Sequence, residues 1–63
     1  MKLYAAKTIY FGADAPTTYY YSDKQKALDF LSTCANGEVE EVTAEIDRFP
    51  FEGCTWNDLD YWN

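Results

Sequence analysis

The spacing of apolar and polar residues in the first third of the chain predicts an antiparallel hairpin. Residues 2–11 alternate in character, so that apolar side chains share one face with Lys7 as the exception. Residues 17–21, TTYYY, are β-branched or aromatic, which suits a pleated strand. The connecting residues 12–16, GADAP, contain the glycine and proline typical of turns. We therefore predict strands over 2–11 and 17–21, paired as a hairpin.

Residues 23–36 have the spacing of an amphipathic helix. Ser22 is the expected N-cap, and Gln25 three residues later completes a capping-box pattern. The expected stop is Asn36 followed by glycine. Phe30 falls on the flank of the apolar face. The residues predicted to form that face are Ala27, Leu28, Leu31, Cys34 and Ala35.

Residues 40–49 predict a third strand with one buried face. Val42, Ala44 and Ile46 alternate with polar residues, as in a half-buried strand. Val39 has the wrong parity for that face, so ordered pairing is expected to begin near Glu40 unless a bulge resets it. Pro50 ends the strand because it cannot donate to a ladder.

The predicted fold is a small single α+β domain over residues 1–63, with the element order β-β-α-β. A right-handed crossover through the helix places the third strand beside the first, giving the strand order 2-1-3. The helix then covers one face of the sheet. The tail 50–63 forms a short helix or an extra strand. A helix capped by Thr55 separates its apolar residues better, and the bare second face of the sheet offers it a place to dock.

Composition and charge limit the kinds of partner that the protein is expected to bind. The chain of 63 residues is 48% hydrophobic and 19% aromatic, which gives a small domain enough apolar surface for a core. Its net charge is −6: residues 1–36 carry four Lys and three Asp, and residues 37–63 carry eight acids and one Arg. Because phosphates are bound by Lys and Arg, direct nucleic-acid and anionic-membrane binding are disfavoured. We expect a protein partner with a basic surface.

The residue inventory argues against an enzyme, a metal and a cofactor. The chain contains no histidine and only three glycines, which removes the usual catalytic triads and glycine-rich phosphate loops. Asp58 and Asp60 could meet at a divalent cation, but no complete calcium-loop spacing surrounds them. Cys34 is expected in the core and Cys54 in a loop, both reduced. With Lys7 interrupting any signal-peptide core and no apolar stretch of about 20 residues, we expect a cytoplasmic protein.

Two groups of residues are candidates for partner binding. The acidic group comprises Glu41, Glu45, Asp47, Glu52, Asp58 and Asp60, and the aromatic group comprises Tyr19, Tyr21 and Trp62. Residues 38–47 hold five acids, about one charge per 7 Å of strand, whereas duplex DNA carries one per roughly 1.7 Å. DNA mimicry would therefore need further acids folded onto the same face. The alternative is that each acid simply solvates an edge strand.

Two hypotheses for function follow. The first is a small acidic inhibitor or adaptor that occludes a basic, nucleic-acid-binding surface of a larger protein. By size and composition alone, it is analogous to phage and mobile-element proteins that block host nucleases, polymerases or CRISPR effectors. The second is a self-assembling structural protein that dimerises through the open face of its sheet, with the acids keeping it soluble.

Overall fold

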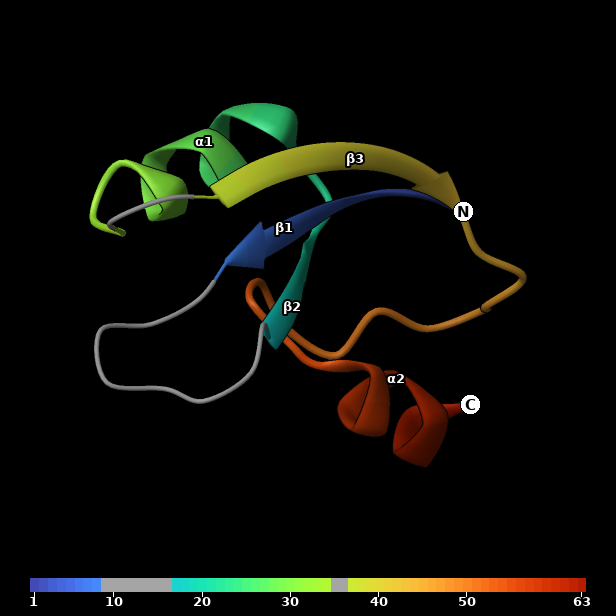
Figure 1. The fold of residues 1–63 in the computed structure, drawn as a ribbon. Helices are drawn as coiled ribbons and strands as arrows, with labels where there is room; N and C mark the ends of the chain where they lie inside the picture. The colour runs from blue at the N-terminus through green and yellow to red at the C-terminus, as the bar shows by residue number, and fades with distance from the viewer. Residues whose placement is uncertain (9–16, 35–36) are drawn as a thin grey trace.

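A computed structural model describes residues 1–8, 17–34 and 37–63 and has the predicted α+β architecture (Figure 1). Its elements are β1 (Lys2–Thr8), β2 (Thr17–Tyr21), α1 (Lys24–Leu31), β3 (Gly37–Thr43) and α2 (Trp56–Trp62). The three strands form one antiparallel sheet in the order β2-β1-β3. This confirms the predicted strand order and the helix after β2. The predicted turn at 12–16, the last residues of the first strand and the predicted helix stop at residue 36 lie outside the described residues.

Helix α1 covers one face of the sheet and the C-terminal segment covers the other (Figure 1). The central strand β1 serves both faces because successive side chains point to opposite sides. Ala6 faces α1, and Leu3 faces the C-terminal segment. The second face of the sheet is therefore covered by the C-terminal segment, which was expected to dock there.

The α1 side of the core is built from small and aromatic side chains. Ala6, Tyr21 and Ala27 are buried together, and Phe30 packs against them with its ring centroid 5.1 Å from that of Tyr19. Phe30 thus lies on the inner face of α1 and not on its flank. Leu28, which was predicted to face inward, is 42% exposed. One small residue at position 27 allows the helix to approach the tyrosines closely.

Both ends of α1 differ from the prediction. Asp23 is the N-cap: its carboxylate accepts the Gln25 N–H at 2.7 Å. Ser22 instead bonds to Glu52, far along the chain. The helix ends at Leu31 because the hydroxyls of Ser32 and Thr33 each bond a carbonyl in the last turn, and the backbone N–H of Thr33 turns back three residues to Phe30.

Strand β3 runs from residue 37 to 43 and not from 40 to 49. Val39 pairs with Ala6 on the α1 side, whereas Val42 pairs with Leu3 on the opposite side. A strand covered on both faces buries residues of both parities, so the alternation rule for a half-buried strand misplaced its start. Its last paired residue is Thr43, opposite Lys2 of β1, and Ala44 exchanges hydrogen bonds with Met1 beyond that pair.

The C-terminal segment closes the second face. Leu3, Cys54 and Leu59 are fully buried together, and Val42, Ala44, Ile46 and Phe49 pack around them. The segment also continues the sheet for one residue, since the Tyr20 N–H donates to the Cys54 carbonyl at 2.8 Å and the Gly53 N–H donates back to Tyr20 at 2.8 Å. The thiol assignments were reversed: Cys54 is fully buried and Cys34 is only half-buried.

Helix α2 lies within the tail 50–63, for which a short helix or an extra strand was predicted. Thr55 is its N-cap, and Leu59 is the buried residue that attaches it to the sheet, only 1% exposed. The helix has seven residues, which is too short to be stable without docking. Its position beneath the sheet therefore depends on the packing of Leu59 and on the contacts of the segment that precedes it.

Candidate functional site

Two of the three acids of β3 form ion pairs with lysines of β1. Glu41 pairs with Lys2 at 3.2 Å, and Glu40 pairs with Lys7. In both cases a hydrogen bond from the lysine to the glutamate, reinforced by the negative charge, raises the pKa of the lysine. All four side chains are well exposed, so these pairs contribute little to stability. Because Glu41 is paired with Lys2, its negative charge is compensated within the sheet.

Two more of the predicted binding acids have local structural roles. The Glu52 carboxylate accepts both the backbone N–H of Ser22, at 3.1 Å, and its hydroxyl, which ties the C-terminal segment to the end of β2. The Asp58 carboxylate accepts the backbone N–H and the hydroxyl of Thr55, at 3.0 and 3.1 Å. Asp58 is thus the third residue of α2, and together with the N-cap Thr55 it forms the capping box at the start of the helix.

The two tyrosines predicted to bind a partner belong to the core beneath α1. Tyr21 is buried, and its ring centroid lies 5.8 Å from that of Phe30. Burial, followed by the charge of Glu52, raises the pKa of the Tyr21 phenol. Tyr19 is partly buried and makes an edge-to-face contact with the same phenylalanine. Only a minor part of either ring is available to a partner.

Three of the predicted acids remain uncompensated. In the part of the chain that the structure describes, the exposed carboxylates of Glu45, Asp47 and Asp60 make no hydrogen bond or ion pair. Asp47 is fixed through its backbone, whose N–H donates to the Asn63 side chain at 3.0 Å. We call Glu45, Asp47 and Asp60 the C-terminal acidic patch. It combines the start of the segment after β3 with exposed residue Asp60 of α2.

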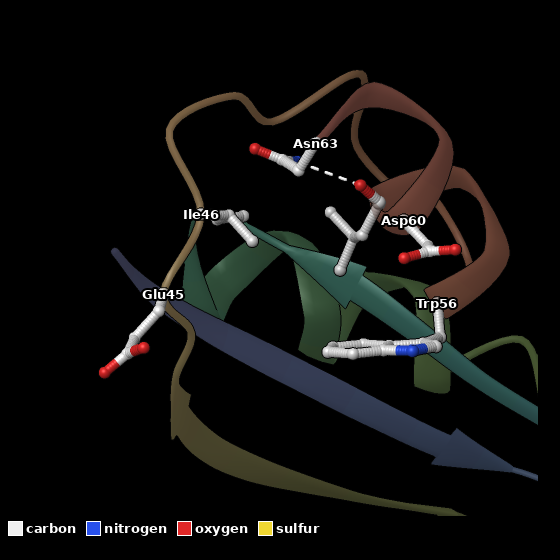
Figure 2. Close-up of a pocket in the computed structure, with 6 residues that line it drawn as sticks. Glu45, Ile46, Trp56, Asp60 and Asn63 are labelled. Atoms are coloured by element: carbon white, nitrogen blue, oxygen red, sulfur yellow. Dashed lines mark hydrogen bonds between the residues drawn. The ribbon is translucent and has the colours of Figure 1, made fainter.

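A shallow pocket opens beside this patch. Its volume is about 210 Å³, and it is lined by Glu45, Ile46, Trp56, Leu59, Asp60 and Asn63 (Figure 2). Ile46 and Leu59 provide an apolar floor that continues the core. Figure 2 shows the Trp56 ring extending across one side and the Asp60 carboxylate on the same helix above it. The Glu45 side chain lies at the edge and directs its carboxylate outward into solvent.

Asn63 holds the two walls of the pocket together. Its side-chain oxygen accepts the backbone N–H groups of Asp47 and Arg48, at 3.0 and 3.1 Å. Its side-chain nitrogen donates to the carbonyls of Arg48 and Leu59, each at 2.9 Å; the dashed line in Figure 2 marks the bond to Leu59. One amide therefore joins the segment after β3 to the last turn of α2. This fixes the spacing between Glu45 and Asp60.

Trp56 is the aromatic residue that the sequence prediction undervalued. It was not among the predicted binding residues, yet it is 58% exposed and lines the pocket. Its ring centroid lies 6.0 Å from that of Tyr20, so the sheet limits its movement. The signal was present in the sequence, because Trp56 and Asp60 are four residues apart and share one face of a helix.

Trp62, the aromatic anchor chosen from the sequence, is 48% exposed but does not line the pocket. It makes an edge-to-face contact with Tyr61, which is 83% exposed. These two rings form a separate aromatic surface at the end of α2. Of the predicted binding residues, the structure thus brings Glu45 and Asp60 to one pocket and leaves Trp62 exposed nearby on the same helix.

Other site types have little support in the described residues. Across 1–8, 17–34 and 37–63 no three His, Cys, Asp or Glu side chains gather as potential metal ligands. Asp58 is directed to Thr55 while Asp60 lines the pocket, so the two do not meet at one cation. Over the same ranges, no helix combines the length and apolar character required to cross a bilayer.

The sequence matches no protein-family model, and no curated protein or solved structure is significantly similar to it.

Proposed function

We propose that this protein is a non-catalytic, acidic protein-binding module that inhibits or adapts a larger protein by occluding a basic surface. The observation that carries the proposal is the C-terminal acidic patch: within the described residues its three exposed carboxylates have no ion-pair partner, and two of them, Glu45 and Asp60, line the pocket together with the exposed Trp56 ring. Charge steers a basic partner toward such a patch, and aromatic side chains supply contact area once it arrives.

The pairing of the other acids shapes the proposal. Glu40 and Glu41 are neutralised by lysines, and Glu52 and Asp58 accept local hydrogen bonds. A continuous array resembling a phosphate backbone would require these side chains to be free. We therefore propose occlusion through a local patch, and not mimicry of a DNA strand. Enzymes that hold nucleic acids, CRISPR effectors and phage-targeted nucleases among them, present basic surfaces of the kind required.

A cytoplasmic location is part of the proposal. Both Cys34 and Cys54 are free thiols, which is the state expected in a reducing compartment. A partner that binds nucleic acid would be found in the same compartment.

A capture experiment tests the proposal. The protein and the variant Glu45→Gln/Asp47→Asn/Asp60→Asn are immobilised and exposed to host lysate across a salt series, and bound proteins are identified by mass spectrometry. We expect the unmodified protein to retain a basic partner that salt releases, because exposed charges are screened beyond about a Debye length, roughly 8 Å at physiological ionic strength. The triple variant should lose that partner.

A matched variant separates the patch from bulk charge. Glu38→Gln/Asp23→Asn/Asp29→Asn changes the same number of charges on other elements. If it loses the partner as fully as the patch variant does, net charge and not the patch explains capture, and the proposal fails. Capture that does not respond to salt would also contradict electrostatic occlusion.

The alternative function, self-assembly, requires a different dimer interface from the one predicted. The sheet face that was to form the dimer is covered by the C-terminal segment, so self-association would have to use the exposed rings of Trp56, Tyr61 and Trp62. Light scattering distinguishes the two functions. A stable dimer that breaks on Tyr61→Ser/Trp62→Ser, without a heterologous partner, would favour self-assembly.

A further inference from the structure

We propose that the pocket beside α2 binds one arginine side chain of the partner protein. The inference rests on the proposed function and specifies how it begins: a protruding arginine on the basic surface enters between the segment after β3 and α2. Three properties of the pocket argue for this occupant, namely its size, its floor and the charge at its rim.

The size favours a single side chain. Pockets for drug-sized ligands and cofactors are roughly 300–1,000 Å³, and this one is about 210 Å³. Liquid water takes roughly 30 Å³ per molecule, so the space corresponds to about seven water molecules. It therefore suits the handful of non-hydrogen atoms in an arginine side chain and excludes a nucleotide.

The floor favours a long aliphatic stem. Ile46 and Leu59 belong to the core cluster, and Leu59 is fully buried. A short polar group would leave this apolar surface wet. The methylene groups of arginine can cover it while the charged head remains at the rim, as long basic side chains do on apolar surfaces.

The rim favours a cation, and the ring favours guanidinium over ammonium. The Asp60 carboxylate has no partner in the described residues, and Glu45 adds a second negative charge at the edge. The exposed Trp56 ring lies one helical turn from Asp60. Guanidinium is planar and weakly hydrated, so it can stack on an indole and still donate to a carboxylate, whereas the compact, strongly hydrated lysine ammonium does this less well.

The arrangement is also preformed. Asn63 joins the two walls through three hydrogen bonds to the backbone of Asp47 and Arg48, and a fourth holds its side chain against Leu59 of α2. Tyr20 supports Trp56 from the sheet. A preformed pocket loses little conformational entropy when it is filled, so a single side chain can act as an anchor for a larger interface.

Titration with small probes, followed by two-dimensional NMR of the isotope-labelled protein, tests this inference. The probe is N-acetyl-arginine amide, and its matched control is N-acetyl-citrulline amide, which has nearly the same shape without the charge. We expect saturable shifts, in the millimolar range, at the Trp56 indole N–H and the amides of Ile46 and Asp60. The citrulline compound should produce almost none, and N-acetyl-lysine amide should bind several-fold more weakly.

Variants assign the contacts. Asp60→Asn should weaken arginine binding about fivefold, the equivalent of roughly 1 kcal/mol for an exposed ion pair. Trp56→Leu should weaken it by a similar factor, while Trp56→Phe keeps a ring and should retain part of the affinity. Glu38→Gln serves as the charge control and should leave it unchanged. The spectrum of each variant without probe shows whether the fold is intact.

Three results would overturn the inference. Shifts spread over the acids of all elements would mean that the arginine compound acts as a general counterion. Equal shifts with the citrulline compound would mean that the pocket does not recognise the positive charge. Equal shifts with the lysine compound would mean that it does not prefer the planar guanidinium group. If the capture experiment still yields a patch-dependent basic partner, then the proposed function stands and only the pocket assignment fails. If arginine binding in the pocket is measured but no partner is captured, the pocket assignment stands and the proposed function fails.

Discussion

Replacement of Leu59 by alanine should detach α2 from the sheet and abolish the pocket. Leu59 is the buried residue of α2, 1% exposed, and it packs with Leu3 and Cys54. Leucine-to-alanine changes at such sites cost about 2–5 kcal/mol, because the transfer free energy of the removed carbons and a residual cavity add together. A 63-residue domain has a total stability of only about 3–9 kcal/mol. The loss is therefore comparable with everything that keeps the domain folded.

The seven-residue helix α2 cannot remain helical alone, so the effect should be partly local. Both tryptophans of the chain lie in α2, which makes fluorescence a direct probe of its docking. We expect the urea midpoint measured by fluorescence to fall further than the midpoint measured by far-ultraviolet circular dichroism. In the unmodified protein the two should coincide, as for a two-state domain.

Leu28→Ala is the matched control. It removes the same atoms from α1, where Leu28 is 42% exposed, and should change stability by less than about 1 kcal/mol. If Leu59→Ala also lost less than about 1 kcal/mol, or if both probes followed one unshifted transition, α2 would not depend on Leu59. The account of how the pocket is held would then be wrong.

Three further predictions concern the C-terminal segment and its contacts. Asn63→Ala removes four hydrogen bonds and should lower the free energy of unfolding in urea by about 1–2 kcal/mol, whereas an unchanged value would show that the amide does not hold the segment. Gly53→Ala should cost about 1–3 kcal/mol in the same assay, because Gly53 has a φ of 83° and a Cβ there would lie 3.2 Å from the Tyr21 hydroxyl oxygen; a stabilised variant would refute this. Burial, and then the charge of Asp58, raises the pKa of the Cys54 thiol, so the stability it contributes is complete below its ordinary value of 9.0 and is lost as pH rises through the raised pKa. Cys54→Ala should therefore flatten the decline in stability above pH 9, measured by urea unfolding at a series of pH values; an equally steep decline would contradict the assignment.

Local patterns determined which elements the chain forms and in what order. The alternation in 2–8, the β-branched and aromatic run at 17–21 and the helical spacing after Asp23 each depend on near neighbours, so they can be read without knowledge of the fold. The tail was predictable for the same reason, because Thr55, Asp58 and Leu59 form a cap and a buried contact within one turn. The preference for right-handed crossovers then led to the strand order 2-1-3 that the structure has.

The predicted element boundaries and residue roles were wrong where tertiary contacts override the local sequence pattern. Val39 appeared out of phase because only one face of the third strand, that of Val42, was predicted to be buried. Val39 lies on the opposite face, which α1 covers. Cys54 was taken for a loop thiol because nothing nearby in the sequence shows that it lies against Leu3 and Leu59. Ser22 lost the capping role to Asp23 while it bonds to Glu52, 30 positions away.

The candidate site divides in the same way. Composition alone determined that the C-terminal half is strongly acidic and that aromatic residues accompany the acids. Only the tertiary structure decided which carboxylates are neutralised by Lys2 and Lys7 and which remain free beside Trp56. The reason is physical: a charge is compensated by what lies within a few ångströms, and those neighbours come from strands and helices that are distant along the chain.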